Sequence, residues 1–402
     1  MTERLYYQQP HLRSFDALVT RVFDRDGRPA ALLDRTAFYP TSGGQPFDTG
    51  RLGEVDVIET IDDDEEIVHV LSAPLVERAA VRGDINWTRR FDHMQQHTGQ
   101  HVLSAAFDRL FDNRTMSFHM GADASTIDLA REMGGADIER AVDEANRVVW
   151  EDRPVTIRTA SPEEAAGLPL RKESVRSGPL RLIDVADFDL SACGGTHVAR
   201  TGEIGVIAVS ATERFRGGSR ITFVCGGRAL RAFRVQRDAI AGSIKHLSVA
   251  PAELPASIDR LQQDLKQSRK DIARLQQSLA VHEAVRLLDD AVAIDGVRVI
   301  VQALEAWDAA GLRAIATSLT AHERVAAALL SATQPAAAAV ARSADVPLDA
   351  NAVLRTLLAT FGGRGGGKAD LAQGAGLAGD IAAMIDAART AITAALREAG
   401  RG

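Results

Sequence analysis

Cysteine is nearly absent from this sequence, with only Cys193 and Cys225 among 402 residues. Two cysteines form at most one disulfide, so a disulfide framework is excluded. In a reducing compartment, a metal-ligand or buried-thiol role is favoured for each of them. The length predicts two or three domains, each large enough to bury a core of its own.

Long apolar runs are missing as well. The N-terminal segment MTERLYYQQPHLRS is polar and lacks the apolar stretch of a signal peptide. The alanine-rich stretch 326–341 comes nearest to a membrane span, but it is weakly hydrophobic and is interrupted by Gln334 and Pro335. We therefore expect a cytoplasmic protein that makes no contact with a membrane.

Positive charge is not in excess, because 47 Lys and Arg residues stand against 54 Asp and Glu residues and the net charge is −7. This balance argues against general affinity for nucleic acids, but it leaves room for a local basic surface. The 46% of hydrophobic and 25% of charged residues are typical of an ordinary soluble protein.

The pattern along the chain predicts an α+β fold built from four segments. Residues 1–88 alternate short β-like runs with turns, which predicts a small β-rich domain, with the acidic DDDEE at 62–66 as a hairpin tip. Residues 89–240 mix helical and strand patterns and predict an α+β core. Residues 292–402 alternate strands and helices and predict a C-terminal α/β domain.

The segment 252–291 has a heptad pattern. Nine positions between residues 254 and 282 are spaced alternately by four and three, and seven of them are Leu or Ile. This spacing predicts a coiled-coil helix, whose partner is either another part of the chain or a second copy of it. The segment 362–376, GGRGGGKADLAQGAG, follows later, and we interpret it as a glycine-rich loop between the last two helices.

A helix is predicted for the segment FDHMQQHTGQHVLSAAFDRLF. We expect it to begin at Asp92, with Gln95 completing a capping-box pattern, and to end at Phe111. Its core-facing stripe is formed by five apolar residues, Val102, Leu103, Ala106, Phe107 and Leu110.

Two histidines of this helix, His97 and His101, are four residues apart and therefore lie on one face. Two imidazoles on one face supply half of a zinc site, although such a pair is also common at surfaces and in cores. The pattern differs from that of the metalloproteases, because Thr98 stands where they have a glutamate. Gly99 costs the helix about 1 kcal/mol relative to alanine, which predicts a close approach to its backbone.

The segment SACGGTHVARTGEIG supplies the other half of a metal site. Cys193 and His197 are separated by three residues, and Gly194 and Gly195 let this segment turn tightly. Together with the helical pair, it provides three imidazoles and one thiolate. That set of ligands suits Zn²⁺.

HTGQH together with CGGTH resembles the editing domain of alanyl-tRNA synthetases and of the free-standing AlaX trans-editing proteins. The segment TAFYPTSGGQPFDTG (36–50) is similar to the glycine-motif segment that precedes this domain, and residues 214–230 are similar to its end. Residues 362–376 resemble the DHH-associated domain. Because the class II aminoacylation motifs are missing, the chain resembles the long form of AlaX.

This resemblance implies a function and a set of ligands. The substrate would be tRNA(Ala) mischarged with serine or glycine, and the reaction would be hydrolysis of the ester to the terminal ribose. Zinc would be held by His97, His101, Cys193 and His197. Four protein ligands complete a tetrahedron, so zinc is then either structural or gives up a ligand to the substrate.

Polar groups near the metal would recognise the substrate. A site built to bind a hydroxyl discriminates by roughly 10⁴ against an analogue that lacks it. Gln100 is a departure from the synthetases, which usually have a threonine there, and His119 matches a pocket position but is equally compatible with an ordinary strand. The candidate substrate contacts are Thr41, Ser42, Gln45, Gln100 and His119.

Two aspartates precede the cysteine turn. Asp187 and Asp189 are near enough in sequence to serve as hydrogen-bond partners of a ligand histidine. A role as solvated loop residues is the alternative for each of them.

Basic residues are candidates for tRNA contact. Arg214, Arg216 and Arg220 open a run of seven arginines that ends at Arg237, and the segment 168–181 adds four more basic residues. A solvated helix face is the alternative. Arg364 and Lys368 are candidates in the glycine-rich segment, where a nucleotide-binding loop is disfavoured because Ala369 follows Gly-Lys.

Two other classes of function compete with a zinc-dependent deacylase. One is a catalytically silent tRNA-binding or synthetase-associated protein with a structural zinc, and the other is a metallo-esterase for a small molecule. We expect tRNA as a partner and a homodimer formed through the coiled coil or the C-terminal domain.

Overall fold

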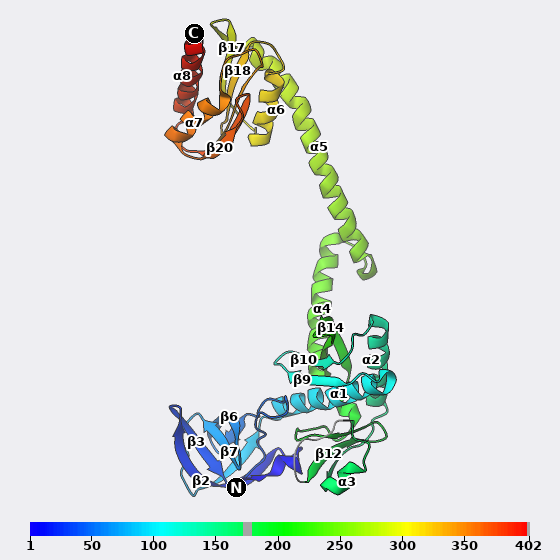
Figure 1. Ribbon diagram of the computed structural model, residues 1–402. Helices are drawn as coiled ribbons and strands as arrows, with labels where there is room; N and C mark the ends of the chain where they lie inside the picture. The colour runs from blue at the N-terminus through cyan, green and yellow to red at the C-terminus, as the bar shows by residue number, and fades with distance from the viewer. Residues whose placement is uncertain (172–178, 400–402) are drawn as a thin grey trace. The chain divides into compact units, whose positions relative to one another are not determined.

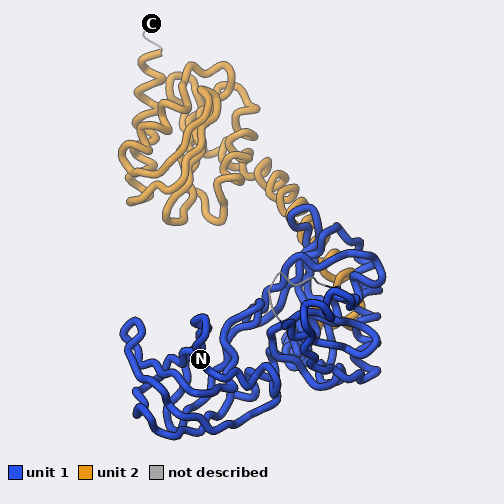
Figure 2. The backbone as a smooth tube through the Cα atoms, turned by 60° about the horizontal axis from the view of Figure 1, so that its bottom comes forward, with its two compact units in different colours: residues 1–243 blue, residues 244–402 orange. Residues whose placement is uncertain are grey.

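The computed structural model describes residues 1–171 and 179–399, and it contains two compact units, 1–243 and 244–402 (Figures 1 and 2). Unit 1 combines a closed β-barrel with an α+β region, and unit 2 combines a long helix with an α/β domain. The predicted α+β fold class is confirmed. The finer division into four segments stays a prediction.

The N-terminal part of unit 1 is a closed six-stranded barrel. Around the barrel, the strands are β2 (Ser14–Arg25), β3 (Arg28–Leu33), β7 (Glu66–Leu71), β6 (Val55–Asp63), β5 (Gly50–Leu52) and β8 (Ala80–Ile85). Alternate residues point inward and form an apolar core that includes Val19, Leu33 and Leu71. The short strands β1 (Glu3–Arg4) and β4 (Arg35–Thr36) pair beside it. The acidic run forms the β6–β7 hairpin tip, as predicted.

Helix α1 (Trp87–Phe111) follows the barrel and carries two of the predicted ligands (Figure 1). It begins earlier than we expected, because the side chain of Asn86 accepts a hydrogen bond from the backbone N–H of Arg89 and caps the helix. Asp92 lies inside the helix and forms an ion pair with Arg228 at 2.7 Å. The predicted start at Asp92 was therefore wrong.

Helix α1 is surrounded by protein over most of its length. Four of the five residues of the predicted stripe are buried, whereas Leu110 is 41% exposed and was wrongly included. The predicted close approach at Gly99 is confirmed, because a Cβ atom there would lie 2.3 Å from Sγ of the buried Cys225. Glycine at this position thus lets α1 pack directly against the strand that ends at Cys225.

Two antiparallel sheets pack with α1. In the first, the strand order is β14 (Ile207–Phe215), β15 (Gly218–Cys225), β10 (Ser125–Leu129) and β9 (Thr115–Met120). In the second, it is β11 (Val155–Ala160), β12 (Leu180–Val185) and β13 (Asp189–Ala192). Helices α2 (Gly135–Trp150) and α3 (Pro162–Ala166) connect these strands, and α4 (Gly226–Leu247) follows β15. One apolar core joins α1 and α2 to both sheets.

Unit 2 contains a six-stranded sheet with helices on both faces. The strand order is β16 (Val292–Ile294), β17 (Val297–Leu304), β18 (Val325–Ser331), β19 (Ala336–Arg342), β21 (Leu371–Leu377) and β20 (Arg364–Gly367). One face packs against α7 (Ala350–Phe361) and α8 (Ile381–Ala399). The other face packs against α6 (Ala309–Leu319) and the last turns of α5 (Leu254–Asp289).

The glycine-rich segment was wrongly predicted as a loop. It forms the hairpin of β20 and β21 at the edge of the sheet. The reason is steric, since a Cβ atom at Gly365 would lie 2.3 Å from the carbonyl oxygen of Gln373, so glycine lets the two strands lie this close. All four residues of β20 are exposed.

Helix α5 covers most of the segment predicted as a coiled coil, and its apolar seam faces solvent. The exposed residues of the seam include Ile258, Leu261, Leu265, Ile272, Leu275 and Leu279. No described part of the chain covers them, so pairing of this helix stays a prediction. Among the described residues, no helix has the length and hydropathy needed to cross a bilayer.

Candidate metal centre

The four predicted ligands lie together in unit 1. His97 and His101 come from adjacent turns of α1, and Cys193 and His197 come from the segment that follows β13. Their ligand atoms all lie within 4.8 Å of one another. Sγ of Cys193 is 3.4 Å from Nε2 of His97 and 3.4 Å from Nε2 of His197. A tetrahedral zinc places nitrogen and sulfur ligands about 3.5 Å apart, so the donor set fits zinc.

Each ligand imidazole is held at Nδ1 by a side chain that is not a ligand. The contacts are His97 with Gln45 Oε1 at 2.8 Å, His101 with Asp189 Oδ2 at 2.9 Å, and His197 with Thr98 Oγ1 at 3.2 Å. When Nδ1 donates in these contacts, the lone pair of every imidazole is on Nε2, which faces the cluster. The three rings are thus oriented for binding one ion.

Gln45 lies behind the ligands rather than beside an open pocket. It is fully buried, and its Oε1 accepts hydrogen bonds from His97 and from the backbone N–H of Thr196 at 3.1 Å. Its Nε2 donates to Oγ1 of Thr196 at 2.8 Å. Gln45 therefore connects the glycine-motif segment to both halves of the ligand set, and the predicted contact of this side chain with substrate does not match its position.

The two aspartates differ in position. Asp189 is buried and accepts hydrogen bonds from His101 and from Arg171. Burial alone would raise the pKa of this carboxyl, but the hydrogen bond from His101 and the charge of Arg171 hold the pKa well below its usual range. Asp187 lies exposed in the turn between β12 and β13 and contacts no ligand, so its predicted role was wrong.

Protonation in the cluster favours metal binding. Burial lowers the pKa of His97 to about 3, and burial lowers the pKa of His197 well below its ordinary value. For Cys193, burial opposes ionisation, but a hydrogen bond with His101 and nearby positive charge lower the pKa of its thiol overall. Neutral imidazoles and a thiolate are the forms that bind zinc.

His119 does not face the cluster. The ring of its neighbour Phe118 stacks on His97 with centroids 5.4 Å apart and an interplanar angle of 30°. Successive side chains of a strand point to opposite faces, and His119 is exposed on the other face of β9. His119 therefore does not line the cluster, and its contact with substrate stays a prediction. Phe118 was missed, although strand alternation carried a signal for it.

Three other candidates for substrate contact have different surroundings. Thr41 is exposed, and its hydroxyl accepts a backbone N–H within the glycine-motif segment. Ser42 pairs with Gln45 in a tight turn. Gln100 is buried beside the ligands, and its Nε2 donates to Oγ of Ser104 at 2.8 Å. Ser42 thus pairs with Gln45, which contacts His97, and Gln100 directly precedes the predicted ligand His101 in α1.

The predicted basic surface is divided by ion pairs. Arg228 is buried against Asp92, so its inclusion in an exposed surface was wrong. Arg220 donates to Asp128 at 2.7 Å. Arg214 and Arg216 are exposed, and Arg214 forms a surface ion pair with Glu132 at 3.2 Å. Of the four basic residues in segment 168–181, Lys172 and Arg176 lie outside the described residues.

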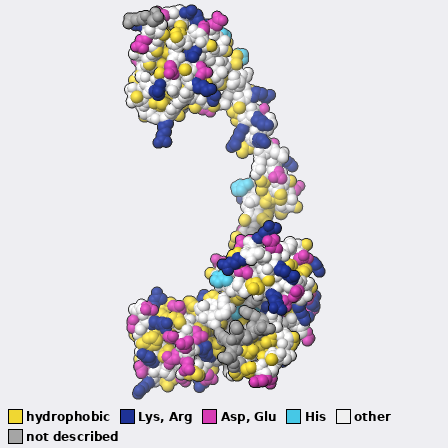
Figure 3. Space-filling model, viewed as in Figure 1, with side chains coloured by type: hydrophobic (Ala, Val, Ile, Leu, Met, Phe, Trp, Pro, Cys, Tyr) yellow, Lys and Arg dark blue, Asp and Glu magenta, His cyan; other side chains and the backbone are white. Residues whose placement is uncertain are grey.

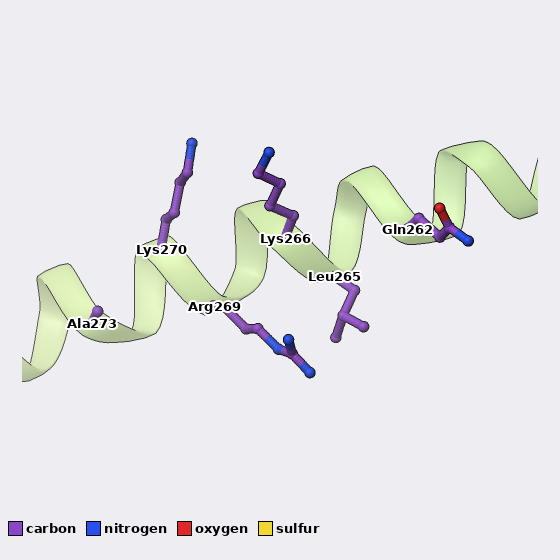
Figure 4. A pocket seen from close by; sticks show the side chains of 6 residues that line it. All are labelled: Gln262, Leu265, Lys266, Arg269, Lys270 and Ala273. Atoms are coloured by element: carbon purple, nitrogen blue, oxygen red, sulfur yellow. The ribbon is translucent and has the colours of Figure 1, made fainter. Parts of the chain in front are cut away.

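Exposed positive charge is also present in unit 2. Arg364 and Lys368 are exposed at the edge hairpin, and Lys and Arg side chains gather along α5 (Figure 3). A shallow hollow on α5 is lined by Gln262, Leu265, Lys266, Arg269, Lys270 and Ala273. Lys266 and Lys270 project from one side of the helix, and Leu265 projects from the other (Figure 4).

Comparisons with known proteins identify the domains and the family of this chain. The model of the threonyl and alanyl tRNA synthetase second additional domain matches residues 180–221, and the model of the DHHA1 domain matches residues 296–394. The chain is 33% identical to the alanyl-tRNA editing protein AlaX-L of Pyrococcus horikoshii, over 93% of this chain and 94% of that protein.

Alanine–tRNA ligases are similar over part of their length. Those of Methanoculleus marisnigri and Pyrococcus abyssi are 35% and 33% identical over 93% of this chain, which spans only 41% and 42% of them. The matches define a protein that combines a synthetase second additional domain with a DHHA1 domain. Within that class, the chain belongs to the AlaX-L family of alanyl-tRNA editing proteins.

Proposed function

We propose that this protein is a zinc-dependent deacylase that hydrolyses the ester bond of mischarged tRNA(Ala) in trans, in the cytoplasm. Seryl-tRNA(Ala) is the proposed main substrate, and glycyl-tRNA(Ala) is the second. The observation that carries the proposal is the convergence of one nitrogen from each of three imidazoles and one Sγ within 4.8 Å, in a chain of the AlaX-L family.

The chemistry asks little of the protein, because an aminoacyl ester is already activated. A bound zinc would supply positive charge that polarises a carbonyl oxygen or a water molecule. The protein's own residues must position the ester and exclude the wrong amino acid. Phe118 covers one face of His97, and the glycine-motif segment packs directly on β9, since a Cβ atom at Gly44 would lie 3.0 Å from Phe118.

Selection of serine over alanine requires a partner for one hydroxyl group. We assign this role to Ser42 and Gln100, which lie beside Gln45 and the α1 ligands and whose side chains are not used to orient an imidazole. A hydroxyl-binding site rejects an analogue without the hydroxyl, because its polar groups are then left unpaired.

Binding of tRNA is proposed for both units. Arg214 and Arg216 in unit 1, with Arg364 and Lys368 in unit 2, are exposed and can meet phosphates. We further propose that the exposed apolar seam of α5 pairs with the same helix of a second copy, because the heptad spacing matches that of a coiled coil.

The proposal is tested by measuring deacylation of seryl-, glycyl- and alanyl-tRNA(Ala) by the full chain. We expect seryl-tRNA(Ala) to be cleaved fastest and alanyl-tRNA(Ala) to be spared. Cys193→Ala is expected to lose both zinc and activity. Cys225→Ala is the matched control, since its thiol is buried against Gly99 and is not a ligand.

Other outcomes would contradict the proposal. Zinc binding without cleavage of any of the three esters would favour a silent tRNA-binding protein. Cleavage of small esters but of no aminoacyl-tRNA would favour a metallo-esterase.

A further inference from the structure

Arg181 is a partly buried cation beside the metal cluster, and it is neither a ligand nor a partner of a ligand imidazole. It lies on β12, and its side chain reaches the segment that carries Cys193 and His197. Nη1 donates to the carbonyl oxygen of Cys193 at 2.7 Å and to that of Gly195 at 2.9 Å. The backbone carbonyl of Arg181 accepts the N–H of Cys193 at 3.1 Å. Arg181 thus holds Cys193 on both sides of its Cα atom.

The contact with Gly195 continues to the ligand helix. In the peptide group between Gly195 and Thr196, the oxygen accepts a hydrogen bond from Arg181 and the N–H donates to Oε1 of Gln45. The same oxygen of Gln45 accepts Nδ1–H of His97. An unbroken series of hydrogen bonds therefore runs from Arg181 through one peptide group and Gln45 to a ligand on the opposite side of the cluster.

The turn that contains Cys193 and Gly195 passes close to the ligand ring of His97. A Cβ atom at Gly195 would lie 2.1 Å from Cε1 of His97, so the chain passes directly against the ligand ring. The N–H of Gly195 points to Sγ of Cys193 at 3.4 Å. The carbonyl oxygens of Cys193 and Gly195 both accept a hydrogen bond from the same nitrogen of Arg181.

Arg181 also ties this turn to the N-terminal segment. Nε donates to the carbonyl oxygen of Tyr7 at 2.9 Å. Nη2 is buried and has no partner among the described residues. A buried donor nitrogen without a hydrogen bond is costly, and an apolar side chain would fill the same space without that cost.

We propose that Arg181 is a positioning residue for the metal centre: it fixes the Cys193–Gly195 turn so that the thiolate and Nε2 of His197 meet the two imidazoles of α1. A residue of this kind acts through the ligands, and loss of such outer contacts typically weakens metal binding or activity by about 10- to 100-fold. The inference rests on the proposed function only in requiring that the cluster binds zinc.

The test measures metal affinity in the full chain. Zn²⁺ affinity is determined by competition with a chelator for the wild type, Arg181→Met and Arg181→Lys. We expect Arg181→Met to bind Zn²⁺ about 10- to 100-fold more weakly. Arg181→Lys keeps the charge and one donor nitrogen, and its Zn²⁺ affinity should fall between those of the wild type and Arg181→Met.

A spectroscopic readout separates positioning from a general loss of stability. Co²⁺ bound at the site reports its geometry through ligand-field bands and its thiolate through a sulfur-to-metal charge-transfer band. We expect both features to change in Arg181→Met while far-ultraviolet circular dichroism stays that of the wild type. Arg158→Met is the matched control, because Arg158 lies in the same sheet but pairs with Asp184 at the surface, and its spectrum and affinity should be unchanged.

The outcomes are distinct for the two claims. If the wild type binds neither Zn²⁺ nor Co²⁺, the proposed function fails. If the wild type binds and both Arg181 variants match it in affinity and spectrum, only the role of Arg181 is overturned. If Arg181→Met does not fold, Arg181→Lys decides, and wild-type affinity in that variant overturns the inference.

Discussion

At the scale of single residues, the cluster is defined as much by what holds the ligands as by the ligands. Nδ1 of each imidazole forms a hydrogen bond with one side chain, that of Gln45, Asp189 or Thr98. Because all three contacts lie on the outer side of the rings, the inner nitrogens are left for one ion. The three imidazoles are therefore oriented as a metal centre requires.

The four ligands and Asp189, the partner of His101, could be proposed from the sequence, whereas Gln45 and Thr98 could not be predicted as partners of His97 and His197. Residue type and spacing identify His97 and His101 because four residues make one helical turn. Gln45 lies 52 residues before His97 and meets it only because the barrel segment folds back on α1. The position of His119 could not be predicted either: alternation shows that Phe118 and His119 point to opposite faces, but the sequence alone does not say which face meets the cluster.

One prediction at this scale concerns the glycine that touches a ligand. Gly195→Ala would place a Cβ atom 2.1 Å from His97, so the turn must move and the ligands separate. We expect Zn²⁺ affinity to fall by at least about 10-fold, measured by chelator competition. Gly134→Ala is the control, because nothing lies within 4 Å of its added Cβ atom. Equal affinity in the two variants would contradict the geometry of the turn.

A second prediction concerns pH and the barrel. His69 is fully buried, with Nε2 2.8 Å from Oγ1 of Thr36, and burial lowers its pKa to about 4 from 6.5. The folded state thus binds fewer protons than the unfolded state between these values. The free energy of unfolding should be insensitive to this group above pH 6.5 and should fall as pH drops towards 4, by roughly 3 kcal/mol.

Thermal unfolding of His69→Gln at several pH values tests this expectation. Its melting temperature should fall less steeply than that of the wild type between pH 6.5 and 4. His246→Gln, at an exposed position of α4, is the control and should follow the wild type. Parallel slopes in all three proteins would show that His69 does not carry this dependence.

At the scale of elements, α1 organises unit 1. Beside its two ligands, it carries Asp92, which binds Arg228, and Gln96, whose amide pairs with both backbone groups of Cys225. The helix is thereby fixed to β15 and to the start of α4. Periodicity predicted the helix and its apolar stripe but not its start. Asn86 and Asp92 are both good capping residues, and only tertiary contacts decide which of them caps the helix.

The edge hairpin of β20 and β21 is an element that the sequence led us to predict wrongly as a loop. Glycines usually indicate a loop, but here they let β20 lie against β21 at the end of the sheet. The signal that was available was the alternation at the start of β21, where Ala372 and Gly374 are buried between less buried neighbours. The low β-propensity of glycine was outweighed by the pairing of β20 with β21 at the edge of the sheet.

A prediction for this hairpin is that its charges bind tRNA phosphates. The double variant Arg364→Gln, Lys368→Gln should bind tRNA(Ala) more weakly, and the slope of log K against log salt should become shallower by about 1 for each phosphate that is no longer neutralised. Arg389→Gln on α8 is the control, since it removes one exposed charge from the same domain. An unchanged slope in the double variant would place tRNA elsewhere.

A prediction for α5 is that its seam joins two copies of the chain. Leu265→Ser with Leu275→Ser should reduce the mass in multi-angle light scattering from that of a dimer to that of a monomer, because both side chains are more than half exposed in one chain. Lys266→Ser, on the side opposite Leu265 (Figure 4), should leave the mass unchanged. A monomeric wild type would contradict the pairing.

At the scale of the whole molecule, we expect catalysis and tRNA binding to be divided between the two units. Unit 1 contains all four ligands, and unit 2 contains the seam of α5 and the edge hairpin. We predict that a chain ending at Ala250, after α4, still hydrolyses seryl-tRNA(Ala) at saturating tRNA but with a raised KM. This is the signature of a loss of uniform binding. A fall in kcat with unchanged KM would mean that unit 2 takes part in the chemistry.

The most direct measurement is the initial rate of seryl-tRNA(Ala) hydrolysis by metal-free protein as Zn²⁺ is added back. We predict that the rate rises with bound zinc and levels off at about one ion per chain, as four converging ligands require. A rate that is independent of zinc, or that stays at the uncatalysed value when the site is full, would contradict a zinc-dependent deacylase.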